Sequence, residues 1–267
     1  MRLKLFGLTT MQTALDSREK PRPDTALKVA VIIVTFNNAD TIETCIASAL
    51  SQSGFSLNND LLVLLADNNS TDGTVDLVNR AFGEEIILCK NSSNLGFSLA
   101  NNQEIAKALN LGADYVMLLN PDVRLNPNAL RYLVDALKVD PFAGAACPKL
   151  YRSDTALKPI MPLQFDSTGM YMTPALRHFD RGSNVADVGQ FDAESYVFGA
   201  SGAAVVFSRP FILDAAFHSG NRGEPLELFD NSFFIYREDA DLAWRGQWLG
   251  WKCRYVPKAV GYHRRVV

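Results

Sequence analysis

The 267-residue sequence predicts an α/β fold with a mainly parallel central sheet, and three observations support this prediction. Residues 29–36, VAVIIVTF, form a continuous run rich in β-branched residues, which is typical of a strand buried on both faces. Further apolar runs alternate with amphipathic helical patterns, and this alternation requires crossover connections within a parallel sheet. Polar loops follow the expected strands, at the edge of the sheet where such folds bind ligands.

Each element of the first half follows from its own pattern. A helix is expected from about Asp40, because apolar residues recur with helical spacing from Ile42 to Leu50. Strands are expected at 61–66, 85–89 and 114–119, where short apolar runs are bounded by polar loops. The helices between and after them are expected around 75–82, up to about 109, and over 130–137.

The second half is less regular. Residues 151–198 are rich in Pro, Gly, Ser and Asp, which predicts long loops with short strands. A strand is expected at 202–208, a helix from Glu238 to about Gly250, and a last strand at 252–257. We expect residues 1–27 to be a variable lead-in and 28–267 to form one domain, with a ligand-binding half (28–122) and a second half (123–267) that completes the site.

Composition excludes several classes of protein. The net charge of -3 and the absence of a Lys/Arg-rich run argue against nucleic acid as a partner. The four cysteines are widely spaced and form no CxxC pair, which argues against a zinc site or a disulfide framework. No apolar run reaches membrane-spanning length, and MRLKLFGL is too short and broken for a signal peptide. We therefore expect free thiols and a cytoplasmic location.

Two common nucleotide-binding motifs are missing. No GxGxxG follows the first strand, which argues against a dinucleotide-binding enzyme, and no GxxxxGK[ST] loop indicates an ATPase or kinase. The similar string GASGAA, at 199–204, precedes a strand instead of following one.

Two acidic residues end strands of the expected sheet. Asp67 can accept a hydrogen bond from the imide N–H of a pyrimidine, or it can simply cap the turn-rich loop DNNSTDGT. Asp122 can bind Mg²⁺ or Mn²⁺ through carboxylate oxygen, or it can start the helix that follows it.

The C-terminal part contains a further acidic cluster and a histidine. Glu238, Asp239 and Asp241 stand at the expected helix start, where a carboxylate can act as a general base or merely complement the helix dipole. His263, in GYHRR, can ligate a metal through a ring nitrogen or lie on the surface. Taken one at a time, these four signals do not decide between chemistry and structure.

A resemblance of the whole chain decides the matter. The segments occur in the order VAVIIVTFNN, LADNNSTDGT, NSSNLGFSLANN, YVMLLNPDV, FGASGAAVVFSR, FFIYREDADLAWRGQWLGW and VPKAVGYHRR. This series resembles the family 2 glycosyltransferases with the GT-A fold, a Rossmann-like sheet flanked by helices with an irregular acceptor-side half. More narrowly, it is similar to the rhamnosyltransferase-like branch of bacterial polysaccharide assembly. The resemblance covers residues 28–265.

The resemblance implies a role for each matched residue. On the donor side, it implies contacts to the nucleotide and sugar from Thr35, Asn37, Asp67, Gly96, Phe97, Asn101 and Asn120. It implies an acceptor side that includes Gly202, Glu238 and Trp251, with Asp239 as the general base and Asp122 and His263 as ligands of Mg or Mn. One departure affects the metal: Asn120 replaces the first acid of the family's DxD motif, which weakens the expected metal site.

The function expected from this resemblance is inverting transfer of a sugar from a UDP- or dTDP-sugar, dTDP-rhamnose first, to a hydroxyl of a glycan or lipid-linked glycan. The latter acceptor would place the protein at the inner membrane face, held peripherally. One alternative is a sugar-nucleotidyltransferase, but VTFNNADT lacks the Gly-rich loop expected there. Another is a non-catalytic nucleotide-sugar-binding module, against which the retained Asp122, Asp239 and His263 argue. Oligomeric state leaves no trace in the sequence.

Overall fold

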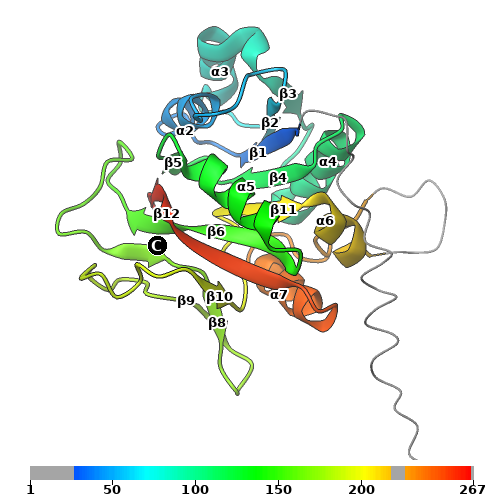
Figure 1. Cartoon of the computed structure of the whole chain (residues 1–267). Helices are drawn as coiled ribbons and strands as arrows, with labels where there is room; N and C mark the ends of the chain where they lie inside the picture. The colour runs from blue at the N-terminus through cyan, green and yellow to red at the C-terminus, as the bar shows by residue number, and fades with distance from the viewer. Residues whose placement is uncertain (1–26, 218–225, 266–267) are drawn as a thin grey trace, which may run out of the picture.

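The computed structural model describes residues 27–217 and 226–265 (Figure 1). Its helices are α2 (Ile42–Leu50), α3 (Thr74–Phe82), the 3-10 helix η1 (Gly83–Glu85), α4 (Gly96–Asn110), α5 (Ala129–Val139), α6 (Arg209–Ala215) and α7 (Glu238–Trp248). Its strands are β1 (Val29–Thr35), β2 (Leu61–Asp67), β3 (Ile87–Lys90), β4 (Tyr115–Leu119), β5 (Val123–Leu125), β6 (Ala143–Arg152), β7 (Phe165–Ser167), β8 (Met170–Met172), β9 (His178–Asp180), β10 (Ser195–Val197), β11 (Ala204–Ser208) and β12 (Lys252–His263).

One sheet organises the domain, in the order β10-β12-β6-β11-β4-β1-β2-β3. The pairs β4–β1, β1–β2 and β2–β3 are parallel, as the alternating pattern of the first half predicts. β11 then pairs antiparallel with both β4 and β6, so the sheet becomes mixed in the second half. The α/β fold class is thus confirmed, with its parallel part in the first half.

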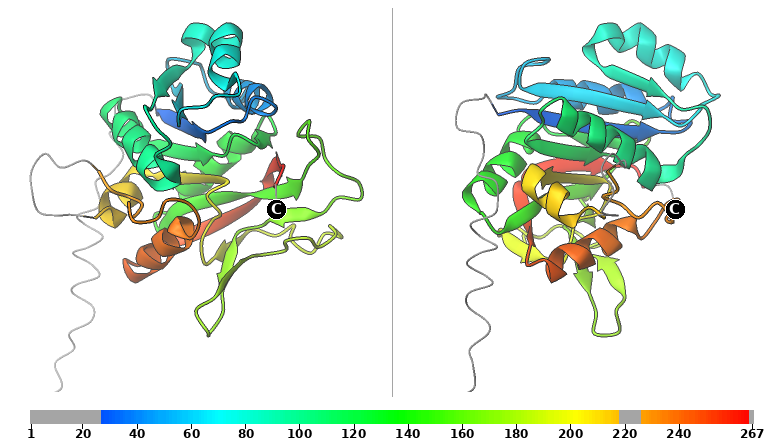
Figure 2. Two further views of the ribbon diagram at one scale, coloured as in Figure 1. Left: turned by 180° about the vertical axis from the view of Figure 1, so that it is seen from behind. Right: turned by 90° about the vertical axis from the view of Figure 1, so that its right-hand side faces the viewer.

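The side chains of β1 alternate between the two faces of the sheet, and helices cover both faces. In β1, Val29, Val31 and Ile33 pack into one apolar cluster, together with residues of α2, α3 and α5. Ala30 and Ile32 point to the opposite cluster, which contains residues of α4, α6 and α7 (Figure 2). Burial on both faces accounts for the uninterrupted apolar run, because neither face of the strand meets water.

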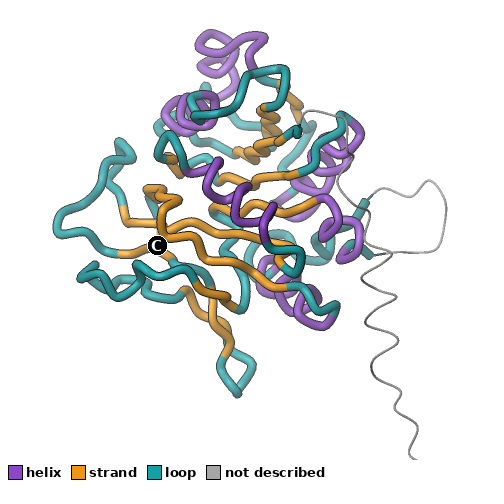
Figure 3. Tube along the Cα trace, viewed as in Figure 1, coloured by secondary structure: helices purple, strands orange, loops and turns teal. Residues whose placement is uncertain are grey.

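The second half contains elements that the sequence patterns did not indicate. β6, which reads AGAACPKLYR, is a ten-residue strand buried along nearly its whole length, although small residues have weak strand propensity. The last strand, expected at 252–257, continues to His263 because β12 pairs with β6 along its length and with β5 at its end. Between β6 and β11, loops and short strands dominate as expected (Figure 3).

Three further outcomes concern the expectations about the chain as a whole. The four cysteines are free, as expected, and Cys45, Cys147 and Cys253 are buried. Residues 1–26 of the expected lead-in lie outside the described residues, and the division at residue 122 stays a prediction. Within the described part, none of the helices has the length and apolar character needed to cross a bilayer.

Candidate active site

A cleft of about 920 Å³ opens beside the carboxyl end of β1 and the loop after β4. Asp122 and Asp239, more than a hundred positions apart in the sequence, both line it. The predicted site residues that line this cleft are Thr35, Gly96, Phe97, Asn120, Asp122, Gly202, Glu238, Asp239 and His263. The sheet therefore brings most of the predicted donor, metal and catalytic positions together at one edge.

Strand pairing places His263 beside Asp122. β12 runs antiparallel to β5 with His263 opposite Val123, so the histidine reaches the loop that carries Asp122. The His263 Nε2 atom lies 3.4 Å from the Asp122 Oδ1 atom, and the Arg264 N–H donates to the Asp122 carbonyl at 3.0 Å. On the other side of the ring, Nδ1 lies 2.7 Å from Oδ2 of Asp166, a fully buried carboxylate.

These two carboxylates determine the charge of the histidine. Burial alone would lower the pKa of His263, but hydrogen bonds and charge attraction from Asp122 and Asp166 outweigh burial and raise the pKa to about 9. In the absence of a cation, the ring is therefore positively charged at neutral pH, at the edge of a cleft suited to an anionic group.

The same group of residues has the chemistry of a divalent-cation site. A histidine whose Nδ1 is held by a carboxylate presents Nε2 to a metal, and Asp122 adds a hard oxygen ligand. The residues thus fit Mg²⁺ or Mn²⁺, with two protein ligands and an orienting partner in Asp166. Within residues 27–217 and 226–265, no group of three His, Cys, Asp or Glu side chains has the geometry of a complete protein-only site. Water and the oxygens of a bound diphosphate are the kinds of ligand that would complete such a site.

Asp166 also connects the histidine to the short hairpin β8–β9. The Arg265 Nε atom lies 3.0 Å from Asp166 Oδ1, and Arg265 Nη1 donates to Asp180 Oδ2 at 2.7 Å. Asp180 ends β9, so this chain of charges ties the hairpin to the metal-binding side of the cleft. Asp166 was not found by sequence analysis, since FDSTG contains no motif; only pairing of β7 with β6 buries it here.

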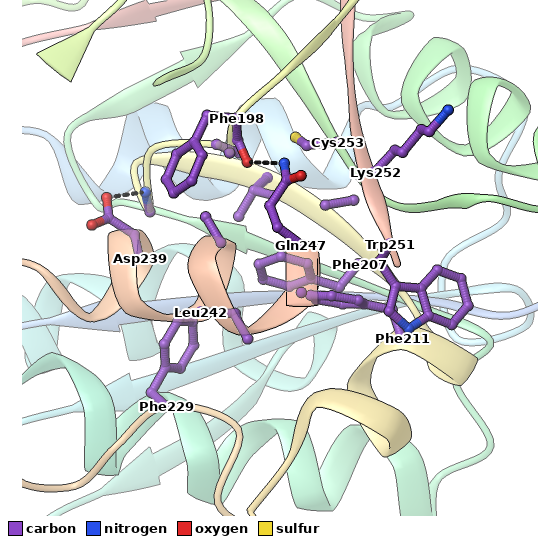
Figure 4. Close-up of a pocket in the computed structure, with 17 residues that line it drawn as sticks. Phe198, Phe207, Phe211, Phe229, Asp239, Leu242, Gln247, Trp251, Lys252 and Cys253 are labelled. Atoms are coloured by element: carbon purple, nitrogen blue, oxygen red, sulfur yellow. Dashed lines mark hydrogen bonds between the residues drawn. The ribbon is translucent and has the colours of Figure 1, made fainter. Parts of the chain in front are cut away.

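Asp239 begins α7 and is held by the backbone. Its Oδ2 atom accepts a hydrogen bond from the Gly202 N–H at 3.1 Å (Figure 4). Its Oδ1 atom accepts one from the Ala240 N–H at 2.8 Å. Burial raises the pKa of Asp239 above its usual range, although both hydrogen bonds oppose the rise. The carboxylate is thereby fixed in place and made more basic than an exposed aspartate.

Glu238 precedes it and is more fully enclosed. Burial, followed by repulsion from Asp239, raises the pKa of Glu238 to about 7. Its Oε2 atom is buried and has no hydrogen-bond partner among the described residues. Glu238 is therefore a polar group in the cleft wall that still lacks a partner.

The backbone of the Phe234 segment lies close to Gly96 and Phe97 in the lining of the cleft. Gly96 has φ of +75°, and a Cβ atom there would stand 2.3 Å from the Phe234 carbonyl oxygen. That carbonyl accepts a hydrogen bond from the Phe97 N–H at 2.6 Å. At Gly202, a Cβ atom would approach the Phe97 ring to 3.1 Å. Glycine at 96 thus allows the segment before α7 to dock on the start of α4.

Three predicted donor-side residues lie outside the lining of the cleft. Asp67 is 2% exposed, accepts a hydrogen bond from the Ser70 N–H, and keeps an unpartnered buried Oδ1 atom. Asn37 instead bonds the neighbouring loop, accepting from the Thr71 N–H at 2.8 Å. Asn101 donates to the Phe97 carbonyl within its own helix. Asp67 is thus buried outside the cleft lining, and its imide contact stays a prediction. The Asn37 side chain supports its neighbouring loop, and the Asn101 side chain supports its own helix.

Trp251 differs from its predicted position at the acceptor side. It is 5% exposed and packs edge-on against Phe211 (Figure 4). Its Nε1–H donates to Asp214. It lies in the apolar cluster between the sheet and the helices α6 and α7. A tryptophan next to a strand start is equally common in a core, and the sequence offered no means to tell the two apart.

Sequence analysis also missed Asn102, which connects α4 to the segment before α7. Its amide group bonds the backbone of Leu228 and Phe229 and the side chain of Asn231, more than 120 positions away. A buried asparagine in the middle of a helix gives no local signal of such a partner.

The fold is that of a glycosyltransferase, and comparisons with known proteins identify the family. A model of the family described as "Glycosyl transferase family 2" matches residues 30–195. The chain therefore belongs to glycosyltransferase family 2.

Individual relatives extend the comparison. The chain is 29% identical over 259 residues, covering 88% of it and 75% of the relative, to N-acetylglucosaminyl-diphospho-decaprenol L-rhamnosyltransferase of Mycobacterium tuberculosis. It is 20% identical over 243 residues, covering 87% of it and 48% of the relative, to poly-beta-1,6-N-acetyl-D-glucosamine synthase of Staphylococcus aureus.

Among solved structures, that of GalNAc-T7 with UDP, GalNAc and Mn²⁺ superposes with a TM-score of 0.67 at 14% identity, covering 96% of this chain. The chain spans half of that structure's length and about half of the synthase. At this identity, the likeness confirms the GT-A fold alone.

Proposed function

We propose that this chain transfers a sugar, with inversion, from a UDP- or dTDP-sugar to a hydroxyl of a lipid-linked glycan in bacterial polysaccharide biosynthesis. The observation that supports this most directly is the shared cleft, which both Asp122 and Asp239 line. The name of the mycobacterial relative favours rhamnose as the transferred sugar and a diphosphate-linked lipid carrying N-acetylglucosamine as acceptor. We therefore propose dTDP-rhamnose as the first donor to test.

Asp239 performs the proton transfer. Its carboxylate takes the proton of the acceptor hydroxyl while that oxygen bonds to the anomeric carbon. The bond between the anomeric carbon and the diphosphate oxygen breaks on the opposite face, and the nucleotide diphosphate leaves with the electron pair. One displacement therefore inverts the configuration. Hydrogen bonds from Gly202 and Ala240 hold the base in place, and its raised pKa increases its proton affinity.

The leaving group is stabilised at the metal-binding side of the cleft. A divalent cation, which Asp122 and His263 would hold, supplies Lewis-acid stabilisation of the departing diphosphate. Asp166 keeps the His263 ring oriented toward that position through the 2.7 Å contact to Nδ1. Mg²⁺ and Mn²⁺ both match this donor set.

Donor recognition belongs to the first half. Thr35 and Asn120 line the cleft near the nucleotide, and Asp67, which pairs with Thr35 across β1 and β2, is the proposed partner of the pyrimidine imide N–H. Gly96 and Phe97 lie by the donor sugar, and Gly202 and Glu238 form the acceptor side. A cytoplasmic location with peripheral contact at the inner membrane face, where lipid-linked acceptors reside, is part of this proposal.

A turnover assay tests the proposal. Purified protein is incubated with Mn²⁺, a short-chain lipid diphosphate N-acetylglucosamine acceptor and dTDP-rhamnose or a series of UDP-sugars; released nucleotide and product are quantified. Asp239→Asn should lower transfer by about 10²–10⁴-fold while nucleotide binding persists. Asp241→Asn, in the same helical turn but paired with Arg245, should retain near-normal turnover.

Each other outcome has a defined meaning. Binding without transfer to any acceptor would identify a non-catalytic module. Formation of pyrophosphate from a nucleoside triphosphate and a sugar phosphate would identify a nucleotidyltransferase. Full activity of Asp239→Asn would remove Asp239 from the base role.

A further inference from the structure

The mouth of the cleft is apolar and comes from two separate elements. One is the β8–β9 hairpin, which contributes Leu176 from its turn and Phe179 from β9; the other is the segment before α7, which contributes Phe234, Ile235 and Tyr236. All five are exposed large apolar side chains. The hairpin projects from the body of the domain (Figures 1 and 2). Exposed apolar groups gathered at a cleft mouth indicate a ligand with an apolar part.

Backbone conformation sets two of these residues apart. Among the described residues, the only residues other than glycine and asparagine with positive φ are Leu157, Leu176, Tyr236 and Arg237. Leu157 is fully buried, so packing of its side chain accounts for its presence. Leu176 and Tyr236 are 66% and 75% exposed, so packing of their side chains offsets little of this strain. Asparagine or glycine would suit both positions better for stability alone.

Positive charge accompanies the apolar groups. Arg177 and Arg237 also line the cleft, each next to one of the two strained residues. The guanidinium of Arg177 lies over the Phe179 ring, 5.5 Å from its centre, but neither guanidinium forms an ion pair with any residue that the structure describes. Arg265, by contrast, is paired with Asp166 and Asp180. Unpaired guanidinium groups are suited to phosphate oxygens.

We propose that Leu176, Tyr236 and the apolar side chains beside them bind the first carbons of an isoprenoid chain, while Arg177 and Arg237 bind the diphosphate that joins this chain to the acceptor sugar. The proposal rests on the proposed function and adds to it the part of the protein that recognises the lipid. The negative charge of a diphosphate complements the two arginines, and a hydrocarbon chain complements the apolar side chains at the mouth of the cleft. One molecule therefore accounts for both features.

The test measures binding without turnover. Farnesyl diphosphate, inorganic diphosphate and farnesol are titrated into the full chain at saturating UDP, and in a parallel series saturating dTDP, so that the donor site is filled. Farnesyl diphosphate should bind at least about tenfold more tightly than either fragment. The double variant L176N/Y236N should lose this advantage, and R177Q/R237Q should weaken diphosphate-dependent binding but leave farnesol unaffected.

Controls separate recognition from folding. Asparagine adopts positive φ more easily than leucine or tyrosine, so L176N/Y236N should unfold at the wild-type temperature or above it. L176M/Y236F keeps both side chains apolar, so it should bind farnesyl diphosphate as the wild type does, unlike L176N/Y236N. V139S/V188S removes two apolar side chains that are 78% and 84% exposed elsewhere, and it should bind as wild type does.

Three results would overturn the proposal: no preference for farnesyl diphosphate over inorganic diphosphate, wild-type affinity in L176N/Y236N, or equal binding to phosphatidylcholine vesicles with and without a lipid diphosphate. The last result would indicate a membrane surface as the occupant. The proposed function fails separately, through absence of sugar transfer while these binding differences persist. Conversely, efficient transfer with no dependence on the lipid chain would contradict only the assignment of the mouth.

Discussion

Replacing Asn102 with alanine tests how α4 is held against the segment before α7. The Asn102 Oδ1 atom accepts from the N–H groups of Leu228 and Phe229 at 3.0 and 2.9 Å, and its Nδ2 atom donates to the Phe229 carbonyl at 2.7 Å. Because Leu228 and Phe229 are fully enclosed, alanine would leave three buried backbone groups without partners. At about 1 kcal/mol each, the loss is about 3 kcal/mol.

This loss should be visible in thermal unfolding. For a domain of this size, about 3 kcal/mol corresponds to a decrease in Tm of about 6–12 °C. The segment that Asn102 anchors leads to Tyr236, Arg237 and Asp239, so the KM for the acceptor should also rise.

Asn101→Ala is the matched control for this experiment. Asn101 is equally buried, but its side chain makes a single hydrogen bond to the Phe97 carbonyl of its own helix. The gain in helix propensity offsets part of that loss, so the change should stay under about 1 kcal/mol. A Tm of Asn102→Ala within about 2 °C of wild type, or an equal decrease in Asn101→Ala, would refute the reasoning. A marked fall in nucleotide affinity in Asn101→Ala would instead support its predicted donor contact.

Further predictions concern the metal side and the acidic pair. Asp166→Asn should weaken Mn²⁺ binding in the presence of nucleotide by about 10–100-fold, because the orienting partner of His263 loses its charge; unchanged Mn²⁺ titrations would contradict this. Asp122→Ala should abolish the stimulation of transfer by Mn²⁺ that EDTA reverses in wild type, and a persisting EDTA effect would place the metal elsewhere. Glu238 has its pKa raised from 4.5 to about 7, so the folded state binds more protons than the unfolded state between these values. Its stabilising contribution is therefore present below pH 4.5 and is lost as the pH rises through 7. Glu238→Gln should flatten this decline in urea unfolding measured from pH 5 to 8; parallel curves for variant and wild type would exclude Glu238 as its source.

The first half of the fold could be predicted because its elements carry their own signals. β1, β2 and β4 are apolar runs covered on both faces, and α5 shows its buried side in its sequence spacing. β6 has no such signal, since its alanines and glycine become a strand only through pairing with β11 and β12. Local sequence patterns therefore predict helices and strands that consist of apolar residues. They miss strands such as β6, which pairing with adjacent strands stabilises.

The candidate site divides in the same way. Asp122, Asp239 and Gly202 could be proposed because residue type and motif order point to their chemistry. Asp166 and Asn102 could not, because each acts through a partner that is remote in sequence and adjacent only in the fold.

The register between β12 and β5 decides whether His263 can lie beside Asp122 and Asp166. His263 pairs with Val123, and the side chains of a strand alternate between its two faces. A shift by a single residue would turn the His263 ring to the opposite face of β12 and separate it from both Asp122 and Asp166. Two features resist such a shift. Gly261 lies against the Leu150 side chain, where a Cβ atom would come within 2.8 Å, and the Arg264 N–H donates to the Asp122 carbonyl. The position of the His263 ring therefore depends on packing along the whole of β12. The contacts of the GYHRR segment with Asp122 and Asp166 consequently follow from the sheet and not from the local sequence.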